Sequence, residues 1–473
     1  MQITLILPEL ALSIACLILF FCTLGRMRGE TLHTLTVALS ILSLGAALFA
    51  CGQEGTLFFD TYRIDLLSQL FKVMITFGLV LVLCITPGSR GVEAKFLPEY
   101  LLFLATGALG LVLLVSSHEL LTIVLSLEIS SFAVCVLIPL RGLRMHREQM
   151  EAAVKYFLFG VCVIGIMLFG MSYIFGLTGS THLSDLALKL PSLLKNEPLA
   201  VIGMVMMLCA FFYKLSFFPM HFLTPDVFEG SANETAGFYA TLPKIAVTAV
   251  IIRLVSLAGA EVGRFTWVLA IFAVLSMTVG NLAALVQNDL KRLLAYSSIA
   301  HAGYLMIGIL SVNRLGLASS VYYILGYLLM NLACFYVIYQ LSPDGKNLTF
   351  EHLSGLYRRS PLLAFTLATA AFGLTGIPPT IGFTGKFLIF TAAFQKGFHA
   401  LVILAVVNAA ISLFYYLKMV RAAYIQVENP GDALSLTLPA RLLGVFFIAS
   451  IILTGILPQG FIALAERAVS GLH

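Results

Sequence analysis

Hydrophobic residues occur along this chain in long runs that short polar connections separate. Fourteen of these runs have the length of a bilayer-spanning helix, about 20 residues. They lie near 3-24, 32-51, 66-86, 98-115, 119-140, 151-176, 198-218, 238-257, 265-286, 291-311, 315-341, 361-394, 398-424 and 438-463. An even number of spans predicts both termini on one side of the membrane. The connections are short and free of low-complexity sequence, so residues 1-473 are expected to form a single all-α membrane domain.

Composition supports an integral membrane protein. The 473 residues are 60% hydrophobic and 11% charged, with a mean hydropathy of +1.00, whereas soluble domains carry roughly 25% charged residues. The first run has no basic segment before it and no small-residue cleavage site, so it is expected to remain as a helix rather than be removed as a signal peptide.

The net charge of +5 does not indicate a nucleic-acid partner, because most basic residues lie in the short loops between spans. One set of alternate loops holds Arg26, Arg28, Arg90, Lys95, Arg141, Arg144, Arg147, Lys291, Arg292, Lys346, Arg358 and Arg359. The other set holds about half as many. The positive-inside rule therefore predicts a bacterial-type inner membrane protein with both termini on the non-cytoplasmic side.

The eight cysteines and nine histidines give no sign of a metal or redox site. No two cysteines form a C-x-x-C pair, and no histidines show the spacing of a metal or haem ligand set. We therefore expect the cysteines to pack as small hydrophobic residues and the chain to bind no redox cofactor or metal of its own.

Charged residues inside the spans are the informative ones, because a charge at mid-bilayer costs roughly 2.5 to 3.5 kcal/mol even on a lenient scale. Glu128 lies near the middle of the fifth run, in LSLEISS. Lys214 precedes Pro219, and Lys386 follows a segment rich in proline and glycine, GIPPTIGFTG. Proline cannot continue the helical hydrogen-bond pattern, so the seventh and twelfth spans are predicted to be broken beside a lysine. Broken helices persist in membranes where they line a cavity.

Other polar residues have a structural interpretation as well as a functional one. Lys244 is expected only about one and a half turns inside its helix, so its ammonium group could reach the interface instead. Lys155 lies still nearer to a basic loop, and His301 is as consistent with a structural histidine as with a relay. Four further charges nearer to span ends are interpreted as interfacial anchors: Glu9, Lys72, Arg253 and Lys418.

A set of buried lysines with one carboxylate has the chemistry of a proton relay. Burial disfavours a charged lysine, and a carboxylate within about 6 Å favours it again, so a moving ion pair can switch whether the lysine holds its proton. A membrane potential of about 100 mV costs roughly 2.3 kcal/mol per charge, which a pKa change of about 1.7 covers. Glu128 and Lys214 are the predicted switch, and Lys244, His301 and Lys386 extend the line.

Several motifs then resemble one family over nearly the whole chain. They include LSLEISS, EAAVKYFLFG, TPDVFEG, LPKIA, GNLAALVQNDLKRLLAYSSIAHAGYL and GIPPTIGFTGKF. The chain resembles the antiporter-like membrane subunits of proton-pumping NADH:quinone oxidoreductase (respiratory complex I), most closely subunit N. This resemblance implies a fourteen-helix fold with two inverted five-helix repeats, about 98-257 and about 265-424, each containing a broken helix.

The resemblance also implies roles and partners. Glu128 matches the family's fifth-helix glutamate and Lys214 its partner lysine, Lys244 matches the central lysine, and Lys386 matches the lysine that passes the proton on. The chain itself is expected to bind no cofactor, while the complex uses NADH, FMN, iron–sulfur clusters and quinone. Expected partners are the other membrane and peripheral subunits and lipids, with quinone reached only through the complex and no nucleic acid.

Two departures from the family pattern lie beside the first break. Phe222, Leu223 and Thr224 stand where the family usually has a tryptophan, and SANETAGF follows PDVFEG where the family usually reads APTPVTAF. Three other functions stay open. The chain could belong to a multi-chain cation/proton antiporter of the Mrp type, to an energy-converting hydrogenase, or to a complex in which it is purely structural.

Overall fold

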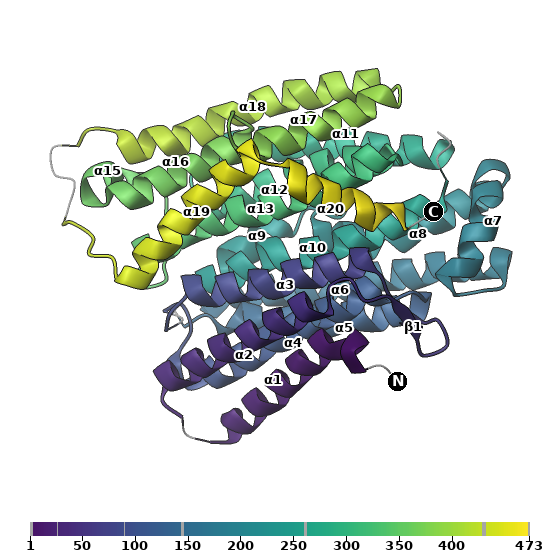
Figure 1. Cartoon of the computed structure of the whole chain (residues 1–473). Coiled ribbons are helices and arrows are strands. Elements are labelled where there is room, and N and C mark those ends of the chain that lie inside the picture. Colours follow the sequence, from purple (N-terminus) through teal and green to yellow (C-terminus); the bar gives the residue numbers. More distant parts are fainter. Residues whose placement is uncertain are drawn as a thin grey trace.

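The molecule is a bundle of helices that run side by side, with both termini at one end (Figure 1). The structure, a computed structural model, describes residues 3–25, 27–88, 90–142, 146–259, 263–427 and 432–471. Arg26 and Arg144, two of the predicted loop residues, lie outside the described residues. We call the end that holds the termini the terminal side, and the other end the opposite side. The shared end agrees with the even number of predicted spans.

The N-terminal part packs five helices and a short hairpin. Its elements are η1 (Ile3–Ile6), α1 (Leu7–Leu24), α2 (Gly29–Ala50), β1 (Gly55–Leu57), β2 (Tyr62–Ile64), α3 (Leu66–Ile85), η2 (Ala94–Phe96), α4 (Leu97–Ser116), α5 (Leu120–Leu137) and η3 (Ile138–Leu140). The two strands are antiparallel, with Thr56 opposite Arg63. Asp65 starts α3 as an N-cap, because its carboxylate accepts the Ser68 backbone N–H at 2.8 Å.

The middle of the chain holds the first helix break. Its elements are α6 (His146–Thr178), α7 (Leu183–Asn196), α8 (Pro198–Leu215), α9 (Thr224–Gly230) and α10 (Asn233–Leu257). α7 is not among the predicted spans, because it is too short and too polar to cross a bilayer. Its leucines recur every three or four residues and bury one face, whereas the other face is exposed at the terminal side.

The C-terminal part holds the second break. Its elements are α11 (Arg264–Leu285), α12 (Leu290–Leu310), α13 (Arg314–Leu341), α14 (Phe350–Leu353), α15 (Leu356–Arg359), α16 (Pro361–Thr375), α17 (Ile381–Gln395), α18 (His399–Tyr424), α19 (Leu438–Ile456) and α20 (Gln459–Ser470). The prediction of one continuous span over 438-463 is wrong. α19 ends at Ile456, and Pro458 separates it from the amphipathic α20.

The predicted number of spans is confirmed. Among the described residues, thirteen helices are long and apolar enough to cross a membrane. The shorter apolar helices α16 and α17 follow one another and together form the predicted broken twelfth span. The chain is therefore a multi-pass membrane protein of predominantly helical structure.

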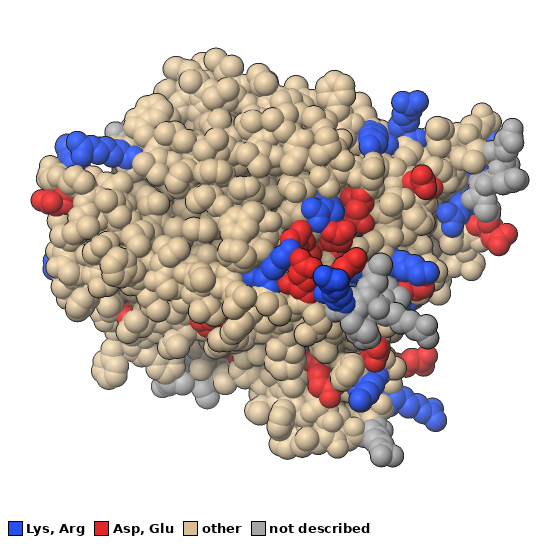
Figure 2. Space-filling view, turned by 180° about the vertical axis from the view of Figure 1, so that it is seen from behind, with Lys and Arg blue, Asp and Glu red and all other residues tan. Residues whose placement is uncertain are grey.

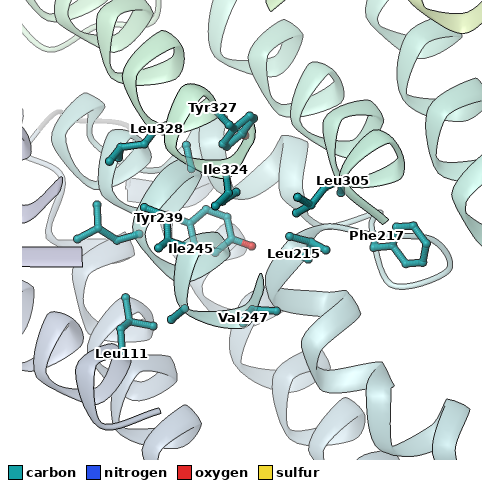
Figure 3. Close-up of a cluster of buried hydrophobic side chains, with 14 of the residues drawn as sticks. Leu111, Leu215, Phe217, Tyr239, Ile245, Val247, Leu305, Ile324, Tyr327 and Leu328 are labelled. Atoms are coloured by element: carbon teal, nitrogen blue, oxygen red, sulfur yellow. The ribbon is translucent and has the colours of Figure 1, made fainter. Parts of the chain in front are cut away.

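Three helices form the centre of the bundle. In the most apolar 18-residue segments of α10, α12 and α13, 89%, 94% and 94% of the residues are buried. The corresponding share in α1, α2, α6, α18 and α19 is 28–33%. Figure 3 shows part of this core, where Leu215 of α8, Ile245 of α10 and Ile324 of α13 lie close together. The outer helices expose apolar side chains, as lipid-facing helices do.

The charged surface is uneven. On the face shown in Figure 2, Lys, Arg, Asp and Glu gather mainly toward the opposite side, and a broad uncharged band covers most of the rest. Such a band is what the hydrocarbon core of a bilayer requires.

Candidate functional site

Each of the two helix breaks leaves carbonyl groups without helical partners. α8 ends at Leu215, and Ser216 takes a left-handed conformation with φ 63°. α16 ends at Thr375, and Gly376 takes φ 92°. Prolines 219, 378 and 379 follow these turns and cannot donate the missing hydrogen bonds. The last carbonyls of a helix also form the negative end of its dipole, so both breaks are suited to hold a cation.

A lysine fills each of these positions. The Lys244 ammonium group donates to the Leu215 carbonyl at 2.7 Å and to Ser216 Oγ at 2.9 Å. The Lys386 ammonium group donates to the carbonyls of Leu374 at 2.8 Å and Thr375 at 2.9 Å. The first break therefore holds Lys244 rather than Lys214, the lysine that directly precedes it, and the second holds Lys386, the lysine that follows it.

The expectation that Lys244 lies near the end of its helix is wrong. α10 begins at Asn233, before the apolar run starts, so Lys244 lies well inside the helix and is only 2% exposed. Residues 231-234 (SANE), which were expected to form a loop, include the first residues of this additional helical segment. The ammonium group therefore cannot reach the interface and depends on the broken end of α8.

Glu128 and Lys214 face one narrow cleft of about 30 Å³, which Leu127, Ser131, Cys135 and other residues also line. Lys214 is buried and donates to Tyr156 Oη at 2.6 Å. Within the described chain, no direct ion pair joins the two groups, and Glu128 Oε1 has no hydrogen-bond partner. Their charges nevertheless interact across the cleft. The structure thus brings the predicted pair together without closing it.

His301 lies in the middle of a cluster of hydroxyl groups. Its Nδ1 is 2.6 Å from Tyr323 Oη, and its Nε2 is 3.2 Å from Tyr416 Oη. Tyr416 Oη also bonds Ser297 Oγ. A very small void of about 10 Å³ is lined by Lys244, His301, Ser298 and Tyr327, among others. His301 is also within electrostatic reach of both Lys244 and Lys386, so it lies near both breaks.

The Lys386 end of the line is also polar. The Lys386 ammonium group lies 4.7 Å from the centroid of the Tyr304 ring, a cation–π contact. Tyr304 Oη accepts from Asn281 Nδ2 at 3.1 Å, and the Asn281 Oδ1 accepts from Tyr415 Oη at 2.9 Å. These contacts fix the aromatic ring beside the lysine.

Lys155 lies apart from this line. Its ammonium group forms ion pairs with Glu151 at 2.7 Å and Asp226 at 2.8 Å, in a partly exposed position at the opposite side. The carboxylates of Asp226 and Glu229 also bind Arg292. Lys155 therefore belongs to a network of ion pairs at the surface.

Three of the charges interpreted as interfacial anchors are not anchors. Lys72 is fully buried and lies 2.5 Å from Glu9, which is itself 6% exposed. Arg253 is buried against Asp65 at 2.7 Å. Only Lys418 is exposed, with its ammonium group 4.3 Å from the centroid of the Phe350 ring. Lys72 and Glu9 lie near span ends but form a pair inside the protein, because α1 and α3 turn the two side chains toward each other.

Sequence reasoning also missed the tyrosines. Tyr156, Tyr323 and Tyr416 contact the lysines or the histidine from other helices, and single tyrosines in apolar spans carry no recognisable spacing. Among the described residues, no group of three or more histidine, cysteine or acidic side chains is placed to hold a metal ion, and the eight cysteines are unpaired.

Comparisons with known proteins define the class. The family of NADH:quinone oxidoreductase/Mrp antiporter transmembrane proteins matches residues 117–412. A chain of the respiratory complex I structure from Thermus thermophilus superposes with a TM-score of 0.84 and is 31% identical, covering 97% of this chain and 99% of its own. A chain of the Mrp complex from Dietzia sp. superposes with a TM-score of 0.88 but is only 19% identical, so it shows a shared fold alone.

Sequence identity then selects within the class. NADH-quinone oxidoreductase subunit N 2 of Opitutus terrae is 46% identical over 454 residues, which cover 96% of this chain and 95% of that protein. The chain belongs to the subunit N family of NADH-quinone oxidoreductase. The resemblance found in the sequence motifs is confirmed, and identity favours this family over the Mrp antiporter subunits.

Proposed function

We propose that this chain is the subunit N-type proton translocator in the membrane arm of an NADH:quinone oxidoreductase, where it moves protons across a bacterial inner membrane during electron transfer from NADH to quinone. Electron transfer through NADH, FMN, iron–sulfur clusters and quinone takes place in the other subunits, with which this chain assembles among membrane lipids. The chain itself binds no cofactor. The opposite side, with the basic loops, faces the cytoplasm, and both termini lie outside it.

One observation carries the proposal: proton-binding side chains, most of them buried, occupy both helix breaks and the region between them. Lys214 and Glu128 face the cleft, Lys244 holds the first break, His301 lies between the breaks, and Lys386 holds the second. Ionisable groups inside spans are costly and mark ion pathways. The similar breaks support two inverted repeats, about 98-257 and about 265-424.

The geometry suggests an order of events. When Glu128 approaches Lys214, the carboxylate stabilises the protonated lysine, and when Glu128 moves away, burial drives the proton off. The proton passes toward Lys244 and, through His301 and its hydroxyl neighbours, to Lys386. Lys386 then releases it to the non-cytoplasmic side. Lys155 takes no part in this line and belongs to the ion-pair network at the cytoplasmic surface.

The partners can be tested by purification. The tagged chain, extracted from its native membrane in mild detergent, is expected to bring flavin- and iron–sulfur-bearing subunits with it in a mass-spectrometric analysis. Recovery with only small membrane chains and no redox protein would contradict assembly in an NADH:quinone oxidoreductase and favour a cation/proton antiporter.

The translocation itself can be tested with Lys386→Met in the assembled complex. Methionine fills the space of the lysine but cannot carry a proton, so the number of protons moved per electron is expected to fall at least about ten-fold. The matched control is Lys418→Met, a lysine of the neighbouring spanning helix that is exposed; it should pump normally. Normal pumping by Lys386→Met would remove this residue from the pathway.

A further inference from the structure

A second glutamate–lysine pair lies outside the line of groups described above. Lys72 of α3 and Glu9 of α1 are 2.5 Å apart, and Tyr62 Oη donates to the same Glu9 Oε1 at 2.6 Å. The Lys72 ammonium group also lies 5.4 Å from the centroid of the Tyr62 ring. All three side chains are buried, and Lys72 is fully enclosed.

Stability does not explain why this pair is buried. Removing two charges from water costs about as much as their attraction returns, and apolar side chains of the same volume often stabilise a protein more. In a membrane the cost of burying charge is paid again during insertion. A buried ion pair in a spanning segment is therefore by default a functional feature.

The surroundings of the pair are polar and poorly satisfied. Glu9 Oε2, both amide atoms of Gln69, His118 Nδ1 and Arg253 Nε are buried and have no hydrogen-bond partner within the protein. Buried polar groups of this kind are normally satisfied by ordered water. These unsatisfied atoms lie on and beside α1, α3 and α10, so the surroundings of the pair are polar rather than apolar.

The polar region leads from the pair to the terminal side. Asp65 binds the buried Arg253 at 2.7 Å, and Arg63, with 40% of its side chain exposed, lies 3.9 Å from the same carboxylate. His118 is within electrostatic reach of both arginines. A series of polar groups thus connects the Glu9–Lys72 pair to the surface at which both termini lie.

The helix that carries Lys72 packs against the helix that carries Lys244. Helices α3 and α10 are antiparallel: Gly78 packs against Leu242, and Asp65 pairs with Arg253. Lys72, about midway between Gly78 and Asp65, is therefore level with the turn of α10 that follows Lys244. A proton moving from Lys244 toward the terminal side passes this level whether or not it also visits Lys386.

We propose that the Glu9–Lys72 pair is a second proton-release site of the subunit, on a branch that leaves the central line at Lys244 and opens at the terminal side. The Lys72 ammonium group gives its proton to the Glu9 carboxylate, which leaves a neutral amine and a carboxylic acid. The acid, oriented by Tyr62, releases the proton to water at the terminal side, and the Lys72 amine takes the next proton from the line. This inference rests on the proposed proton translocation.

Two variants of the assembled complex separate this role from a purely structural one. Lys72→Arg keeps the positive charge and the ion pair, but arginine does not lose its proton in proteins. The double variant Glu9→Gln/Lys72→Met removes both charges together, so it leaves no lone buried charge to disturb folding. If the pair releases protons, both variants move fewer protons per electron, by about two-fold or more.

A surface ion pair at the same side is the matched control. Arg314 and Glu466 are 3.1 Å apart, with 62% and 32% of their side chains exposed. The double variant Glu466→Gln/Arg314→Met should assemble and pump like the wild type. Assembly is measured in each case by the yield of purified complex and by its NADH:quinone activity.

The outcomes are distinct. Wild-type pumping by Lys72→Arg, or by the double variant of the buried pair, overturns the proposal and leaves the pair structural. If the double variant does not assemble, Lys72→Arg alone decides. Lys386→Met is measured in parallel: if it pumps normally, the proposed line fails, whereas a defect in Lys386→Met with normal pumping in the Lys72 variants refutes only the second release site.

Discussion

The chain contains two groups of glutamate, lysine and tyrosine inside the membrane, and they differ in whether the pair is closed. Lys72 and Glu9 are in direct contact, and Tyr62 donates to the carboxylate. Lys214 and Glu128 share a cleft without direct contact, and the ammonium group donates to Tyr156 instead. One tyrosine thus holds the carboxylate of a closed pair, and the other holds the lysine of an open pair.

Because of this difference, we expect the two groups to have different functions. The open pair is not in direct contact, so its separation can change, and lysine protonation depends steeply on the distance to a carboxylate. The closed pair has no such freedom, so it can pass a proton within the pair but cannot switch by approach and withdrawal. The broken end of α8 directly follows Lys214.

Among the variants that test this difference, Lys214→Arg is expected to have the largest effect on proton pumping. Arginine keeps the positive charge next to Tyr156 but does not release a proton, so the switch is locked in its charged state. We expect assembly to be retained and proton pumping to fall at least about ten-fold, measured as protons moved per electron in proteoliposomes. Pumping at the wild-type level would show that Lys214 does not need to lose its proton.

A smaller effect distinguishes the two tyrosines. Tyr156→Phe removes the acceptor that holds Lys214 while Glu128 is away, so pumping should fall severalfold. Tyr62→Phe leaves the Lys72–Glu9 contact intact and should have a weaker effect on the same measurement. An equal loss in both variants would mean that the open and closed groups do not differ in function.

The smallest expected effect concerns the polar region next to the closed pair. Burial, together with the charges of Arg253 and Arg63, lowers the pKa of His118 from 6.5 to about 4. The unfolded state therefore binds a proton as pH falls below about 6.5, while the folded state does not until about pH 4, so folding stability is lost through this window.

His118→Gln removes this contribution. Between pH 7 and pH 5 the thermal midpoint of the wild-type complex should fall. The midpoint of the variant should fall by a few degrees less over the same range. An identical pH dependence in His118→Gln and the wild type would contradict a neutral buried His118.

The sequence was informative where local chemistry decides the structure. Apolar runs predicted the spans, and Pro219 and Pro379 predicted the two breaks, because both features act on the helix that contains them. Lys386 and Lys214 were identified as buried charges for the same reason. Local chemistry also explains the one failed span, since Pro458 ends α19 within a continuous apolar run.

The sequence was uninformative where distant segments meet. Tyr156 lies 58 residues from Lys214 along the chain, and no pattern in either helix indicates that they meet. Glu9 and Lys72 lie near the ends of their runs and so resembled interfacial anchors, although α1 and α3 pair them inside the protein. Lys244 was misjudged because α10 begins in a polar segment that hydropathy excludes from the helix.

The central claim is that Glu128 switches the protonation of Lys214, and the most direct test replaces its carboxylate. Protons moved per electron are measured in the assembled complex with Glu128→Gln, which keeps the shape of the side chain, and with Glu128→Asp, which keeps the carboxylate. The account predicts that the glutamine variant assembles but does not pump and that the aspartate variant retains much of the activity. Wild-type pumping by Glu128→Gln would contradict the switch.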